Sequence, residues 1–247
     1  ALSREESTCN IFSAKLLAYP ESLDNQAPIQ LFNTKDNARY VAESTLTGQN
    51  DAPIIFTANA NEYQLGNDQQ TLTVQLTGKN ADGVNVTKTY TLHRGSYAIE
   101  MNYAVNNSSS QNWQGNLYTQ LIRQNNNTEQ GGMFHINAFF GASMSTATNN
   151  YQKIAFNDMA KKPIDISSPG GWVAMQQHYF LSAWVPNASQ VNQYYTKTLP
   201  DNTYAIGAIG PQISVKPGET GQAKATLYVG PELDQQLTQI APHLDLT

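Results

Sequence analysis

The chain has few charged residues, and this shortage limits what it can bind. Aspartate, glutamate, lysine and arginine make up 13% of the 247 residues, about half of the usual share of roughly 25%. The net charge of −5 and the pI near 5.3 argue against nucleic-acid binding, which depends on a basic patch or stripe. Aromatic residues still make up 10% of the chain, so we expect a folded domain rather than a disordered one.

Cysteine and long hydrophobic runs are equally scarce. Cys9 is the one cysteine, which excludes an intrachain disulfide. No apolar run approaches the roughly 18 residues that a membrane-spanning helix needs, and no signal peptide is visible. These absences predict a soluble domain, which can still be a piece of a membrane protein. Its length suits one large β domain.

Catalytic and metal-binding motifs are also missing. None of the histidines occurs at the spacing of zinc ligands, and these are His93, His135, His178 and His243. Nucleophile-elbow, Walker and dinucleotide-binding sequences are absent too. We therefore expect no cofactor, no metal and no enzymatic activity, and interpret the chain as one that binds and positions other proteins. The alternative is a carbohydrate-binding or sugar-modifying sandwich, because paired carboxylates need only converge in space.

Alternation of apolar and polar residues dominates the chain and predicts a mainly β fold. Residues 71–77 and 84–92 alternate on either side of a glycine-bounded turn, which indicates a β-hairpin with one buried face. Lys88 falls on the apolar side, and we expect it at a rim where its amine reaches water. Residues 124–150 break the alternation and are predicted to form long loops. Further strands are expected at residues 97–105, 113–122, 204–209, 212–215 and 223–229.

One amphipathic helix is predicted near the C-terminus. Leu233, Leu237 and Ile240 recur at steps of three and four and form an apolar stripe. Pro231 suits a first helical turn, because the N–H that proline lacks would be unpaired there. The stripe either docks on its own domain or also contacts a following domain. A shorter helical turn is expected at residues 154–160.

The segment Gly170–Pro186 is the most aromatic part of the chain. It contains Trp172, Tyr179 and Trp184 within a short distance in the sequence. Aromatic rings of this kind usually fill a core. The alternative is an apolar cleft that accepts extended polypeptide chains or lipid-like ligands.

Four stretches in matching order and spacing carry a family resemblance. They are TKTYTLHRGSY at 87–97 with 102–105, GGWVAM at 170–175 with AWVP at 183–186, LYVGP at 227–231, and APHLDLT at 241–247. Together they resemble the large periplasmic domain of the YidC membrane protein insertases of Gram-negative bacteria. The resemblance covers residues 15–247 and leaves residues 1–14 as a separate N-terminal segment.

The resemblance implies a fold and a location. The fold is a twisted β-super-sandwich similar to galactose mutarotase over residues 15–230. A C-terminal helix follows at 231–247 and leads toward a membrane span. The location is the periplasm, as an extracytoplasmic domain of an inner-membrane protein.

The resemblance also implies an accessory role in membrane protein insertion and folding. The partners would be the Sec translocon, SecD–SecF and nascent membrane proteins. Leu233, Leu237 and Ile240 would then form a helix that couples the sandwich to the membrane helices. Fold kinship with mutarotases does not carry their activity over, because fold alone does not imply function.

Overall fold

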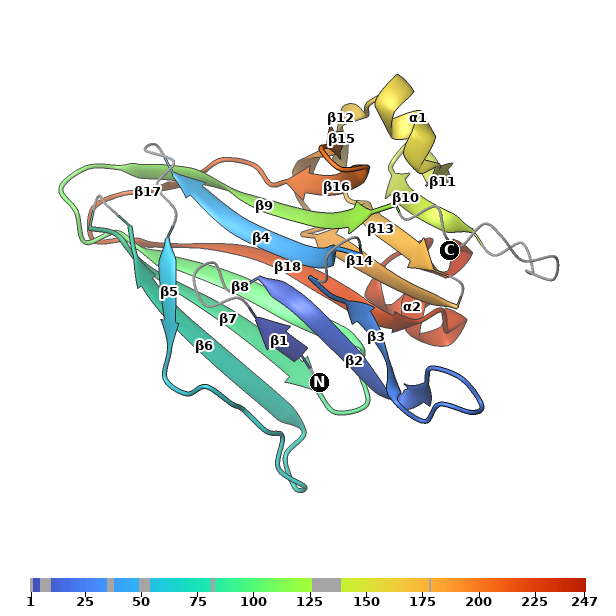
Figure 1. The fold of residues 1–247 in the computed structure, drawn as a ribbon. Helices are drawn as coiled ribbons and strands as arrows, with labels where there is room; N and C mark the ends of the chain where they lie inside the picture. The colour runs from blue at the N-terminus through green and yellow to red at the C-terminus, as the bar shows by residue number, and fades with distance from the viewer. Residues whose placement is uncertain are drawn as a thin grey trace.

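The computed structural model is a sandwich of two antiparallel β-sheets with two short α-helices toward one end (Figure 1). It describes residues 2–4, 10–34, 38–48, 54–80, 83–125, 139–177 and 179–247. The predicted β-sandwich with a small C-terminal helix is confirmed. No helix within these ranges is long and apolar enough to cross a membrane.

The first sheet lies toward the viewer in Figure 1. Its strands are β1 (Leu2–Arg4), β2 (Ile11–Pro20), β3 (Pro28–Phe32), β4 (Tyr40–Gly48), β9 (Trp113–Gln124), β12 (Asp165–Pro169), β15 (Val191–Leu199), β16 (Thr203–Ile209) and β17 (Ile213–Val215). Their order is β1-β2-β4-β9-β16-β15-β12, with β3 paired to β2 and β17 paired to β9.

The second sheet lies behind the first. Its strands are β5 (Ile55–Ala58), β6 (Thr71–Lys79), β7 (Asn85–His93), β8 (Ala98–Asn106), β10 (Phe140–Thr146), β11 (Asn149–Ile154), β13 (Trp172–Gln177), β14 (Phe180–Pro186) and β18 (Thr220–Pro231). Their order is β11-β10-β13-β14-β18-β8-β7-β6-β5. The helical elements are α1 (Phe156–Lys161), α2 (Asp234–Ile240) and the 3₁₀ turn η2 (Leu244–Leu246).

The predicted hairpin is confirmed as β6 and β7, which pair from Thr71 opposite His93 to Lys79 opposite Asn85. The short helix expected at 154–160 is α1, and the other predicted strands also form. The alternating apolar residues meet between the sheets, where Leu76, Met101 and Leu121 are almost fully buried. Period-two alternation was a reliable signal for these strands because each has one buried face.

Buried hydrogen bonds join the two sheets across this core. The hydroxyl of Tyr103 in β8 donates to the backbone oxygen of Ser44 in β4 at 3.0 Å. The indole Nε1 of Trp184 in β14 donates to the backbone oxygen of Gln120 in β9 at 3.1 Å. Because a buried polar group without a partner is costly, these bonds fix how the sheets lie against each other.

The expectation for Lys88 was wrong, because its side chain is 0% exposed and lies between the sheets. Its Nζ lies 5.9, 5.1 and 5.3 Å from the ring centroids of Phe56, Tyr90 and Tyr103. It also donates to the backbone oxygen of Ser44 at 3.5 Å. The alternation had placed Lys88 on the buried face, and the surrounding aromatic faces, which attract a cation, stabilise its amine there.

The expectation of long loops over residues 124–150 was also wrong. Residues 140–146 form β10 between β11 and β13, and β11 begins at Asn149. Ala142, Ser143 and Met144 are all buried, so both faces of β10 are covered. A strand buried on both faces shows no alternation, which is why its small residues suggested a loop. Residues 126–138 lie outside the described ranges.

The first sheet begins earlier than the resemblance indicated. Strand β2 starts at Ile11, and the side chains of Ile11 and Ala14 are 5% and 1% exposed. The strand therefore includes residues that the resemblance had left outside the sandwich.

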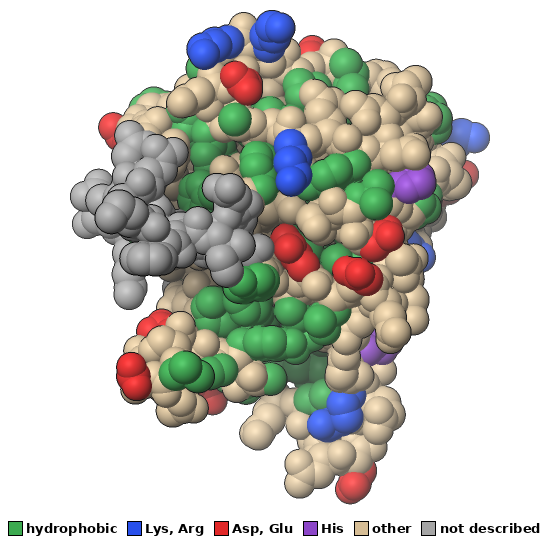
Figure 2. All heavy atoms as spheres, turned by 90° about the vertical axis from the view of Figure 1, so that its right-hand side faces the viewer, with side chains coloured by type: hydrophobic (Ala, Val, Ile, Leu, Met, Phe, Trp, Pro, Cys, Tyr) green, Lys and Arg blue, Asp and Glu red, His purple; other side chains and the backbone are tan. Residues whose placement is uncertain are grey.

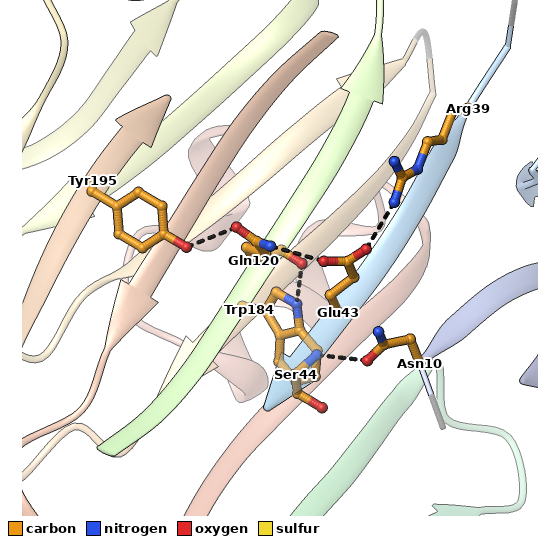
Figure 3. A network of polar contacts seen from close by, with 7 residues as sticks. All are labelled: Asn10, Arg39, Glu43, Ser44, Gln120, Trp184 and Tyr195. Carbon is orange, nitrogen blue, oxygen red and sulfur yellow. Dashed lines mark hydrogen bonds and ion pairs between the residues drawn. The ribbon is translucent and has the colours of Figure 1, made fainter. Parts of the chain in front are cut away.

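A row of polar side chains crosses the outer face of the first sheet (Figure 3). The pairing places Glu43, Gln120, Gly207 and Tyr195 side by side on four neighbouring strands. The Tyr195 hydroxyl donates to Gln120 Oε1 at 2.8 Å, and Gln120 Nε2 donates to Glu43 Oε2 at 2.8 Å. Arg39 completes the row with an ion pair to Glu43 at 3.0 Å. The Tyr195 ring can reach Gln120 only because Gly207 leaves the space beneath it empty.

Replacing Gly207 by alanine tests this row. An added Cβ would lie 2.5 Å from the Tyr195 hydroxyl and 2.6 Å from the backbone oxygen of Thr119. We expect Gly207→Ala to lower the free energy of unfolding by about 1–3 kcal/mol, because overpacking forces side chain and backbone to move. Gly210→Ala is the matched control, since its nearest neighbour would be 3.7 Å away. Equal denaturation midpoints for the two variants would contradict this reading.

Candidate functional site: the C-terminal segment and the sheet face beneath it

The chain leaves the second sheet later than predicted. Pro231 does not lie in the first turn of the helix. It is the last residue of β18 and pairs with Phe180. The backbone N–H of Glu232 donates to the oxygen of Tyr179 at 2.8 Å and extends the strand pairing past the proline. Helix α2 therefore begins only at Asp234, with Leu233 at its N-cap position.

The helix is also shorter than predicted, and the chain turns back sharply after it. Helix α2 ends at Ile240, and Pro242 follows closely, where a ring without an N–H cannot continue a helix. His243 adopts a left-handed conformation with φ of 65°, which reverses the chain into η2. We call residues 232–247, which include α2 and η2, the C-terminal segment.

The C-terminal segment packs on the outer face of the second sheet. The side chains of Leu237, Ala241 and Leu244 are 1%, 4% and 0% exposed. They form a cluster of their own, separate from the core between the sheets, with Trp172, Ala174, Leu181, Ala183 and Tyr228. The Trp172 indole Nε1 donates to the backbone oxygen of Pro242 at 3.0 Å. The segment is therefore part of the folded domain.

The apolar stripe of the predicted coupling helix is divided between the sheet and solvent. Leu237 points into the cluster on the sheet and is almost fully buried. Leu233 is 40% exposed, and Ile240 is partly buried at the border of the cluster. Docking on its own domain is thus seen for Leu237, while contact of the stripe with a following domain stays a prediction.

The predicted cleft aromatics are not brought together. Trp172 lies under the C-terminal segment, while Trp184 lies between the two sheets, on the opposite face of the second sheet. Both side chains are at most 1% exposed. Tyr179 is 65% exposed at the connection between β13 and β14. These rings therefore do not line a common cleft.

A chain of polar contacts borders the C-terminal segment. The Tyr151 hydroxyl donates to Gln176 Oε1 at 2.9 Å, and Gln176 Nε2 lies 3.4 Å from Glu232 Oε1. Partial burial raises the pKa of the Glu232 carboxyl, while the Gln176 hydrogen bond and the charge of Lys153 oppose this shift. Glu232 is thus a carboxylate held at the start of the segment by the sheet.

Among the described residues, metal-binding side chains do not cluster, and the contact between a histidine and a carboxylate is exposed to solvent. The described residues contain no group of three or more His, Cys, Asp or Glu side chains placed to hold a metal ion. His93 Nε2 lies 3.4 Å from Glu100 Oε1, but both side chains are exposed. The cross-strand neighbours of Glu100 are Thr91 and Thr226 rather than aromatic residues. Cys9, His135 and His178 lie outside the residues that the structure describes.

Sequence reasoning missed the roles of Gln176 and Glu232. Gln176 lies on the same strand face as Trp172, because side chains at even spacing share a face. The even spacing from Trp172 could therefore have predicted that Gln176 lies on the same face of the strand. The contact between Gln176 and Glu232 joins residues far apart in the chain and had no local signal.

Removing the indole N–H of Trp172 should loosen the C-terminal segment. We expect Trp172→Phe to cost about 0.5–1.5 kcal/mol, because the part-buried hydrogen bond to the Pro242 oxygen is lost. The variant should also make residues 234–247 more sensitive to limited proteolysis. Trp184→Phe is the matched control, since it removes the same kind of bond to Gln120 without touching the segment. Equal cleavage of the segment in both variants would argue against the anchoring role.

Replacing Glu232 by glutamine should stabilise the domain at neutral pH. A carboxyl whose pKa is raised in the folded state binds its proton more tightly there, so stability falls as pH rises through that raised pKa. Thermal melting should therefore show Glu232→Gln above the parent at about pH 7 and equal to it at about pH 3.5. Asp234→Asn, an exposed neighbour, controls for the loss of one negative charge. A gain of the same size at both pH values would contradict the assignment.

Comparison with solved structures identifies the fold. A galactose mutarotase related enzyme from Lactobacillus acidophilus matches with a TM-score of 0.58 at 11% identity, covering 92% of this chain and 93% of that protein. A galactose mutarotase-like protein from Lactobacillus casei matches with a TM-score of 0.57 at 10% identity, covering 92% and 96%. At such low identity the likeness concerns the fold alone.

Curated proteins give closer relatives. A membrane protein insertase YidC of Coxiella burnetii (strain RSA 331) is 44% identical, and the match covers 96% of this chain and 43% of the relative. The corresponding protein of Legionella pneumophila (strain Paris) is 43% identical, covering 96% and 44%. The chain thus spans less than half the length of these relatives. The model of the YidC periplasmic domain matches residues 7–247. The chain therefore belongs to the family of YidC periplasmic domains.

Proposed function

We propose that the chain is the periplasmic accessory domain of a membrane protein insertase, and that it positions partner proteins rather than catalysing a reaction. Its relatives named membrane protein insertases, at 43–44% identity over nearly the whole chain, support the parent activity. The packed C-terminal segment is the structural observation that carries the proposal. It fixes residues 234–247 to the outer face of the second sheet.

The C-terminal segment suits a coupling role because it is fixed on one side and open on the other. Leu237 and Leu244 hold it to the second sheet, and Trp172 holds the turn between α2 and η2. Leu233 and Leu246 remain 40% and 47% exposed. A force on the exposed side would reach the sheet through packed side chains, because close-packed interiors transmit strain.

The full-length parent protein allows a direct test. We expect Leu233→Ser to slow membrane protein insertion without lowering the melting temperature of the domain, since Leu233 packs little against the sheet and serine suits its N-cap position. Ile166→Ser is the matched control, because Ile166 is 42% exposed on the edge strand β12. Insertion at the same rate in both variants would contradict the coupling role.

A third variant separates coupling from folding. Leu237→Ala should lower the free energy of unfolding by about 2–5 kcal/mol, because it opens a cavity under the segment. Loss of insertion in Leu237→Ala together with normal insertion in Leu233→Ser would mean that only an intact fold is required.

The partners proposed for this domain are the Sec translocon, SecD–SecF and nascent membrane proteins. Photo-crosslinkers on the outer faces of the two sheets and at Leu233 would locate the contact surface in native membranes. Crosslinks to translocon or SecD–SecF subunits support a docking domain. Crosslinks restricted to nascent chains would replace docking with a chaperone role.

A further inference from the structure

Exposed hydrophobic side chains gather at one end of the sandwich. Five of the eight large hydrophobic side chains that are exposed in the described residues are Leu17, Leu23, Tyr179, Leu233 and Leu246. They belong to the end of β2 and its turn, the β13–β14 connection and the C-terminal segment, which all lie on the right-hand side of Figure 1. The C-terminus lies on the same side.

This end of the domain has a hydrophobic surface in front of the core. Figure 2 views it directly and shows a continuous hydrophobic area in a hollow between two projections. Three half-buried rings pack together here, with Tyr19 lying 6.4 Å from Tyr97 and 5.5 Å from Phe180 between ring centroids. Contiguous apolar surface rimmed by polar residues is typical of an interaction site.

The most exposed leucine is held by an ordered turn. Leu23 is 95% exposed in the connection between β2 and β3. Glu21 N donates to Ala27 O at 2.8 Å across the base of this turn. Asn25 Nδ2 donates to Glu21 Oε2 at 2.7 Å, and Gln26 Nε2 donates to Leu23 O at 3.1 Å. The turn therefore presents Leu23 outward on a fixed scaffold instead of folding it back onto the core.

We propose that this end of the domain rests on the surface of the lipid bilayer, with Leu17 and Leu23 entering its interfacial layer. The inference extends the proposed function, because it relies on attachment to a membrane protein through the C-terminal segment. The curated relatives are more than twice as long as the matched region, and their names place them in membrane protein insertion.

A bilayer fits this surface better than a protein partner does. Leu23 projects from the surface on a turn, so a protein would need a matching pocket, whereas a bilayer accepts any protruding apolar side chain. The tyrosines behind it combine an apolar ring with a polar hydroxyl, which suits the boundary between lipid and water. Attachment through the C-terminus raises the effective concentration, so a weak contact is sufficient.

The charges beside Leu23 and within the C-terminal segment are negative, and Lys153 lies near Glu232 as a counter-charge. Glu21 and Asp24 flank Leu23 in the same turn, and Glu232, Asp234 and Asp245 lie in the C-terminal segment. Carboxylates are repelled by anionic lipids and unaffected by zwitterionic ones. Burial of the leucines therefore has to drive the contact, and anionic lipid has to weaken it.

The test uses tryptophan as a depth probe. The chain carrying Leu23→Trp would be attached through a C-terminal hexahistidine to phosphatidylcholine vesicles that contain a nickel-chelating lipid. We expect its emission to shift to the blue and to be quenched by brominated phosphatidylcholine beyond the level of the parent chain. The native tryptophans are at most 4% exposed and provide a constant background. Ile55→Trp is the matched control, because Ile55 is 66% exposed on β5, outside the proposed contact.

Two further measurements sharpen the result. Adding Leu17→Ser to the Leu23→Trp chain should reduce the population in contact with lipid by roughly tenfold, the usual effect of removing one buried leucine. Adding phosphatidylglycerol to the vesicles should also reduce the quenching. Quenching that rises with phosphatidylglycerol would overturn the proposal, because it would indicate a contact driven by basic residues.

Quenching of Leu23→Trp no greater than that of Ile55→Trp would likewise overturn the bilayer contact. So would a blue shift without quenching that grows with protein concentration, because it would identify a second copy of the chain as the occupant. Neither result would affect the coupling role, which depends on Leu233 and the insertion assay. Failure of Leu233→Ser to alter insertion would leave the lipid contact of Leu23 standing.

Discussion

The hydrogen bond from the Trp172 indole to the backbone oxygen of Pro242 anchors the C-terminal segment to the second sheet. It joins a strand in the middle of the chain to the turn between α2 and η2. Around it, Leu237, Ala241 and Leu244 cover a sheet face that would otherwise expose apolar surface. The last residues of the chain are thus packed like a core element, although isolated helices as short as α2 are not stable in water.

Of the three apolar clusters in the described residues, the two larger ones have different roles. The larger one lies between the sheets, where Trp184 and Tyr103 bond to backbone oxygens of the opposite sheet. The smaller one lies on the outer face of the second sheet, beneath the C-terminal segment. Strands β13, β14 and β18 contribute to both clusters through alternate side chains. A displacement of the C-terminal segment would consequently shift β13, β14 and β18, which also form part of the core between the sheets.

Whether a strand or a side chain could be placed from the sequence depends on how it is buried in the fold. Strands with one solvent-exposed face, such as β7 and β8, were predicted correctly because alternating apolar and polar residues indicate a half-buried strand. Strand β10 was missed because both of its faces are covered. The two tryptophans were grouped wrongly because the hairpin register, with Gln177 opposite Phe180, decides which face each one occupies. A shift of one residue reverses the faces, and the two residues between Gln177 and Phe180 carry no glycine, proline, asparagine or aspartate signal that would have marked the turn. Lys88 was misplaced because the rings around it come from three separate strands.

Native-state hydrogen exchange of the unmodified chain tests the central claim most directly. If the C-terminal segment is part of the cooperative fold, the amides of Leu237, Ala241 and Leu244 should exchange only with global unfolding, as slowly as those of β18. Their backbone N–H groups all donate within the segment, to Leu233, Leu237 and Ala241. Exchange of these amides at the rate of a frayed terminus, while β18 stays protected, would contradict the anchoring of the segment. It would show that the segment opens independently and transmits nothing to the sheet.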